Sequence, residues 1–205
     1  FGGPRPHLPV PCPRGMPPTW AGGRYAGSAR AALLAYKERG RRDLAPYLAT
    51  ALAGVVRTAL GADTAGVAVL LVPVPSRGRA ARARGGDHMG RLARLAAHRL
   101  QPALPGIRVA GLLRIRGRPR DAAGLDARQR AANVRGVFVV DRRAAPTGRP
   151  ADVVLLLDDV LTTGATLAEA TRTLGVASIP VRCAAVLAAT LRRSAPGLSE
   201  PARLG

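Results

Sequence analysis

Apolar and polar positions along the chain follow two periods, one typical of helices and one of buried strands. Apolar residues that recur every three or four positions predict helices over 25–40, 43–60, 88–100, 125–132 and 164–174. Continuous apolar runs predict strands over 67–72, 107–113, 137–140, 153–157 and 181–188. Strands that alternate with helices are typical of an α/β fold, so we predict an open, mainly parallel sheet flanked by helices.

The two ends of the chain lack this regular alternation. Residues 1–24 are rich in proline and glycine, and we interpret them as an arm or linker, because such runs favour extended conformations. Residues 25–191 carry the alternating elements and form the predicted domain, while 192–205 are predicted as a loose tail. A total of 205 residues fits a single domain of this kind.

The charge of the chain is strongly unbalanced. It contains 32 basic and 12 acidic residues, a formal net charge of +20. Nearly all the basic residues are arginines, part of which we attribute to the codon bias of a GC-rich genome; Lys37, the single lysine, is interpreted as an exposed helix residue. The excess over acidic residues indicates an anionic partner, namely a phosphorylated small molecule, a nucleic acid or an anionic surface.

Several classes of protein are excluded by the composition. No apolar run approaches the ~18 residues of a membrane-spanning helix, and no signal peptide is visible, so we expect a soluble cytoplasmic protein without a membrane partner. Cys12 and Cys183 are too few for a disulfide framework or a zinc cluster. The three histidines show no metal-ligand spacing with either cysteine, so no metal site built by the protein alone is predicted.

The segment 153–166 carries the clearest chemical pattern. Its strand is predicted to end at Asp158 and Asp159, and a loop of small and hydroxyl residues then leads into a helix. The loop residues are Thr162, Thr163, Gly164, Ala165 and Thr166. Backbone N–H groups at a helix N-terminus bind phosphate, and glycine allows close approach. The two carboxylates suit the hydroxyls of an attached sugar or a Mg²⁺ ion. The alternative is an ordinary helix cap, although a cap needs one carboxylate rather than two.

This segment closely resembles the loop of type I phosphoribosyltransferases that binds phosphoribosyl pyrophosphate (PRPP). The resemblance implies that Asp158 and Asp159 hold the ribose hydroxyls and are the catalytic pair. It also implies that residues 162–166 cradle the 5′-phosphate, with Mg²⁺ bound together with PRPP.

Further motifs occur in the order seen in the ComF (competence) family, and the similarity spans roughly residues 20–190. The motifs are Tyr25 with Tyr36-Lys37-Glu38-Arg39-Gly40, Val72-Pro73-Val74-Pro75-Ser76, Arg84-Gly85-Gly86-Asp87, and Arg128, Asn133 and Gly136. The resemblance implies a type I phosphoribosyltransferase fold with a pyrophosphate loop at Pro75, Ser76 and Arg77. Some members of the family have a role in DNA uptake during natural transformation, so the resemblance suggests a link to that process.

Three functions remain open at this point. One is a phosphoribosyltransferase that transfers phosphoribosyl from PRPP to a nitrogenous base and releases pyrophosphate. Another is a non-catalytic competence protein that binds single-stranded DNA through the arginines of 77–84 and 114–120. The third is a regulator that senses nucleotides with the same fold. The net charge favours DNA binding, but an aromatic content of 3% counts against a base-stacking platform. The sequence names neither the acceptor base nor the oligomeric state.

Overall fold

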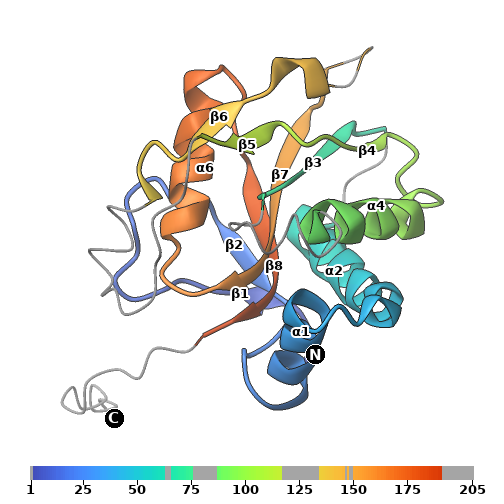
Figure 1. Ribbon diagram of the computed structural model, residues 1–205. Helices are drawn as coiled ribbons and strands as arrows, with labels where there is room; N and C mark the ends of the chain where they lie inside the picture. Colours follow the sequence, from blue (N-terminus) through green and yellow to red (C-terminus); the bar gives the residue numbers. More distant parts are fainter. Residues whose placement is uncertain are drawn as a thin grey trace, which may run out of the picture.

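The computed structural model describes residues 2–62, 66–75, 87–116, 134–145, 147 and 150–190 (Figure 1). The strands are β1 (Arg5–Pro6), β2 (Thr19–Ala21), β3 (Val69–Pro73), β4 (Ile107–Val109), β5 (Leu113–Ile115), β6 (Phe138–Val140), β7 (Val153–Leu161) and β8 (Cys183–Ala189). The helices are α1 (Gly27–Glu38), α2 (Ala45–Leu60), α4 (His88–Leu100) and α6 (Ala165–Val176), with short 3₁₀ turns η1 (Arg42–Leu44) and η2 (Arg142–Ala144). This part of the chain has an α/β fold with an open, mainly parallel six-stranded sheet flanked by four helices.

The strand order of the main sheet is β1-β2-β8-β7-β3-β4, and only β1 runs antiparallel to its neighbour. Strands β5 and β6 form a separate antiparallel pair. The chain passes from β3 through α4 to the outer strand β4, whereas β7 leads through α6 to β8 in the opposite direction. The strand order therefore reverses between β3 and β7, which is where open α/β sheets usually bind ligands.

Side chains alternate between the two faces of the sheet and so divide the core into two parts. Leu71 and Leu155 pack with residues of α1, α2 and α4, while Leu70 and Leu156 pack with α6 and the β5–β6 pair. Figure 1 shows the same layers, with α2 and α4 on one side of the sheet and α6 on the other. Because both faces of the sheet are covered, the central strands carry continuous hydrophobic runs, as in residues 153–157 of β7.

Most predicted elements are confirmed by the structure. Helix α4 matches the range 88–100, and its start is fixed by Asp87, whose Oδ1 accepts a hydrogen bond from Gly90 N at 2.9 Å. The helices predicted over 25–40, 43–60 and 164–174 correspond to α1, α2 and α6. The helix predicted over 125–132 and the tail 192–205 lie outside the described residues.

Three expectations about strands differ from the structure. Residues 1–24, interpreted as an arm or linker, contribute β1 and β2 to the main sheet, where Thr19 lies opposite Ala184 of β8. The run 107–113 is divided between β4 in the main sheet and β5 in the β5–β6 pair, because the chain leaves the main sheet after Ala110. Strand β7 extends to Leu161, so the acidic pair lies inside the strand rather than after it.

Candidate functional site

The acidic pair of β7 lies directly beyond the point where its neighbour β3 ends. Pro73 of β3 is in register with Leu157 of β7, and Val74 N donates a hydrogen bond to Leu157 O at 2.8 Å. The residues that follow, Pro75 after β3 and Asp158 in β7, therefore start from the same edge of the sheet. This edge is the point where the strand order reverses, so the fold supports a ligand site here.

The two carboxylates of the acidic pair have different surroundings. Asp159 is 9% exposed and forms an ion pair with Lys37 of α1. Asp158 is partly buried and its Oδ1 accepts a hydrogen bond from the backbone N–H of Asp159 at 2.8 Å. Neighbouring side chains of a strand leave on opposite faces, which explains why only Asp159 meets the ammonium group of α1.

Lys37 is a site residue that the sequence interpretation missed. Its side chain is 35% exposed, not free in solvent on an outer helix face, and it pairs with a carboxylate of the candidate site. Burial alone would lower the pKa of Lys37, but the interaction with Asp159 outweighs burial and the pKa is raised. One feature of the sequence could have pointed to Lys37: it is the only lysine of an arginine-rich chain.

Replacing Lys37 with methionine is expected to lower the free energy of unfolding by about 1–3 kcal/mol, because a carboxylate that is 12% exposed loses its counter-ion. Chemical denaturation at pH 8 measures this change. The double variant Lys37→Met/Asp159→Asn should regain part of the loss. Arg41→Met, which breaks an exposed pair with Asp43, is the matched control and should change stability little. Equal losses of stability in Lys37→Met and Arg41→Met would contradict a special role for Lys37.

The carboxyl group of Asp158 loses its proton less readily in the folded protein than a free aspartate does. Burial and the neighbouring charge of Asp159 raise the pKa of Asp158 to about 7, from an ordinary value of 3.8. Between these two pH values the folded protein binds more protons than the unfolded chain. This residue therefore makes the protein less stable as the pH rises from about 4 to about 7.

Asp158→Asn is consequently expected to raise the free energy of unfolding at pH 8 by about 1–3 kcal/mol, with the gain fading toward pH 4. The amide oxygen can still accept the hydrogen bond from Asp159 N–H. Denaturation curves across this pH range measure the difference. Asp43→Asn is a control of opposite sign, since Arg41 lowers the pKa of the Asp43 carboxyl. If Asp158→Asn is less stable than the wild type at pH 8, the raised pKa of Asp158 is contradicted.

The loop after β7 forms the N-terminus of α6. Gly164 is the N-cap residue and has a φ of +75°, a conformation that favours glycine. It has no side chain to cap the helix, but the first helical N–H, that of Ala165, donates a long hydrogen bond to Thr163 Oγ1 at 3.5 Å. Thr162 is exposed, Thr163 and Thr166 are half-buried, and Ala165 is buried. The first N–H groups of a helix have no partner within it, so an anion could bind at this end.

Gly164 already has close neighbours from the N-terminal part of the chain. A Cβ atom added at Gly164 would overlap with Met16 Sδ and would lie 3.2 Å from Pro9 Cγ and 3.3 Å from Pro13 Cδ. The sequence interpretation assigned the close approach at this glycine to a phosphate. In the structure, the group that makes this approach belongs to the connection between β1 and β2.

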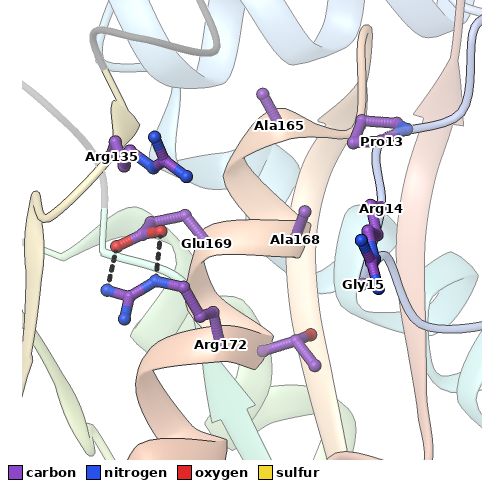
Figure 2. Close-up of a pocket in the computed structure, with 9 residues that line it drawn as sticks. Pro13, Arg14, Gly15, Arg135, Ala165, Ala168, Glu169 and Arg172 are labelled. Carbon is purple, nitrogen blue, oxygen red and sulfur yellow. Dashed lines mark hydrogen bonds and ion pairs between the residues drawn. The ribbon is translucent and has the colours of Figure 1, made fainter.

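A cavity of about 540 Å³ lies beside the same helix. Figure 2 shows Arg14 and Gly15 on one side of α6 and Arg135 on the other, with α6 between them. Glu169 lines the cavity, is buried, and accepts hydrogen bonds from Gly136 N at 2.8 Å and from Arg172. Hydrogen bonding by Arg172 is the main reason why the pKa of Glu169 is lowered. These contacts fix the turn before β6 against α6.

Other predicted site residues lie outside the described part of the chain. Pro75 is half-buried two residues after β3. Ser76 and Arg77 of the predicted pyrophosphate loop are not described, nor are the arginines up to 84 and those of 117–120. Within the described ranges, no group of three or more His, Cys, Asp and Glu side chains is arranged to hold a metal ion. No helix in those ranges has the length and apolar character needed to span a membrane.

Comparison of the sequence with models of protein families and with curated proteins gave no match. The functional interpretation therefore rests on the arrangement of residues at this site and on the resemblance of its motifs.

Proposed function

We propose that the protein has a type I phosphoribosyltransferase fold of the ComF type and binds PRPP at the carboxyl ends of β3 and β7. The observation that carries this proposal is the position of the acidic pair and the Gly164 loop, at the point where the strand order reverses. Asp158 and Asp159 would receive the ribose hydroxyls, and the first turn of α6 would receive the 5′-phosphate. Pro75 begins the segment that would meet the pyrophosphate.

The ion pair of Lys37 with Asp159 adds support to this proposal. The pair places a largely buried carboxylate against a partly exposed ammonium group, and such a pair is weak evidence for a purely stabilising role. It also puts a cation beside the carboxylates that would face the ligand. When PRPP enters, the ammonium group can move from Asp159 toward ligand oxygens and leave the carboxylate to a ribose hydroxyl. The raised pKa of Asp158 fits the same interpretation, since perturbed carboxyl groups concentrate at functional sites.

The proposed reaction is attack by a ring nitrogen of a base on C1 of PRPP. The bond between C1 and the pyrophosphate oxygen breaks, pyrophosphate leaves with the electron pair, and the nitrogen loses its proton to solvent. Carboxylates near the ribose would stabilise the positive charge that develops at C1. Mg²⁺ bound together with PRPP would supply positive charge that offsets the negative charge of the pyrophosphate leaving group. A phosphorylated substrate of this kind agrees with the cytoplasmic location expected from the sequence.

Pyrophosphate release from PRPP and Mg²⁺, measured with each of a panel of nucleobases, tests whether the protein is an enzyme. Release that depends on one base and disappears in Asp159→Asn would support phosphoribosyl transfer. The net charge of +20 favours the second candidate, a non-catalytic protein that binds single-stranded DNA. Retention of a labelled oligonucleotide with no pyrophosphate release would favour that candidate.

A further inference from the structure

The connection between β1 and β2, residues 7–18, which we call the 7–18 loop, is anchored to the sheet at both ends. His7 N donates a hydrogen bond to Thr19 O at 2.8 Å, and Ala184 N of β8 donates one to Pro18 O at 2.8 Å. A movement of the middle of the loop would therefore leave the strands on either side of it in place.

The middle of the 7–18 loop rests on the candidate phosphate site. Met16 is half-buried, packs against the core between the sheet and α6, and is the nearest neighbour of Gly164. Pro9 and Pro13 complete this apolar contact. The site proposed to receive a charged phosphate is therefore covered by a thioether and two proline rings, none of which offers the phosphate a hydrogen-bond donor.

A cavity lies beside the contact between the loop and α6. Residues 13–15 line one side of the cavity of about 540 Å³, and Ala165, Ala168 and Arg172 of α6 line it as well (Figure 2). Side chains next to a cavity lack partner atoms on that side and so lose dispersion energy. Leu8 of the same loop is 65% exposed and contributes little burial. Pro9 and Pro17 of the loop are buried, but the cavity beside residues 13–15 lowers the cost of displacing the middle of the loop, as a movable cover requires.

We propose that the 7–18 loop is an autoinhibitory cover of the phosphate site, with Met16 at Gly164 in the space that the 5′-phosphate of a ligand needs. This inference rests on the proposed function, because it takes the N-terminus of α6 to be the phosphate site. Only the uncovered form binds ligand, so the apparent affinity equals the intrinsic affinity multiplied by the uncovered fraction. Weakening the contact of Met16 must then strengthen ligand binding.

The two methionines of the chain allow a direct test in the intact protein. Met16 lies in the cover, and Met89 is 1% exposed in the core on the other face of the sheet, where it serves as an internal control. With the methionine methyl groups labelled with ¹³C, titration with ribose 5-phosphate should shift the Met16 signal toward that of a solvent-exposed methionine. The Met89 signal should stay in place.

The matched variants are Met16→Ala and Leu8→Ala, which each remove an apolar side chain from the same loop. Met16→Ala should bind ribose 5-phosphate about threefold to tenfold more tightly than the wild type, while Leu8→Ala should bind with unchanged affinity. If ribose 5-phosphate binds equally to the wild type and both variants and the Met16 signal does not move, the autoinhibitory cover is overturned. The proposed function is then left intact. Binding to none of the three overturns the phosphate site, and the cover with it.

Discussion

Gly164→Val is expected to remove measurable binding of ribose 5-phosphate and to lower the free energy of unfolding by roughly 2–4 kcal/mol. A β-branched residue is strained at a φ of +75°, and its Cβ would overlap with Met16 Sδ. The new side chain would also fill the space proposed for the phosphate. Calorimetric titration of the folded variant measures the affinity, and denaturation measures the stability.

Gly61→Val is the matched control for this change. Gly61 ends α2 with a φ of +82°, and a Cβ atom added there meets nothing within 4 Å. It should lose stability through backbone strain alone and keep the wild-type affinity for ribose 5-phosphate. If Gly164→Val folds too poorly, Gly164→Ala offers the same test with a smaller side chain. Unchanged affinity in a folded Gly164 variant would place the phosphate elsewhere.

Asp158→Asn and Asp159→Asn should each weaken binding of PRPP with Mg²⁺ by about tenfold to a hundredfold, while binding of inorganic phosphate changes little. Each substitution removes a charge-assisted hydrogen bond to a ribose hydroxyl, worth about 1.5–3 kcal/mol. Inorganic phosphate has no ribose and depends only on the helix N-terminus. Parallel calorimetric titrations with the two ligands give the comparison.

Asp152, at the other end of β7, provides a control for the acidic pair. Asp152 precedes β7, and its Oδ2 accepts a hydrogen bond from Ala68 N at 2.8 Å, which an asparagine oxygen can also accept. Asp152→Asn should therefore leave both affinities unchanged. Equal losses for PRPP and phosphate in the Asp158 and Asp159 variants would contradict a role in holding the ribose.

The sequence predicted those parts of the fold whose signals are local. Helix α4 has its own capping residue, Asp87, while β3 and the first five residues of β7 are apolar because both faces of these strands are covered. The position of the acidic pair beside the loop and the helix N-terminus follows directly from the chain order. The coarse α/β architecture could be predicted for the same reason.

The remaining features depend on contacts between distant segments. Strand β2 has only three residues in a proline-rich region, and its pairing with β8 gives no periodic signal. The end of β7 was placed too early, since carboxylates at the rim of a sheet remain compatible with strand pairing. The partnership of Lys37 with Asp159 joins a helix to a strand far along the chain. The contact of Met16 with Gly164 was equally invisible, because it depends on how the 7–18 loop returns over α6.

Calorimetric titration of the protein with PRPP, in the presence and absence of Mg²⁺, tests the proposed phosphoribosyl site. Ribose 5-phosphate and a single-stranded oligonucleotide are titrated alongside. We expect saturable PRPP binding at one site, strengthened by Mg²⁺, tighter than that of ribose 5-phosphate and weakened in Asp159→Asn. Absence of PRPP binding under conditions where the oligonucleotide binds would contradict a phosphoribosyl site at the ends of β3 and β7.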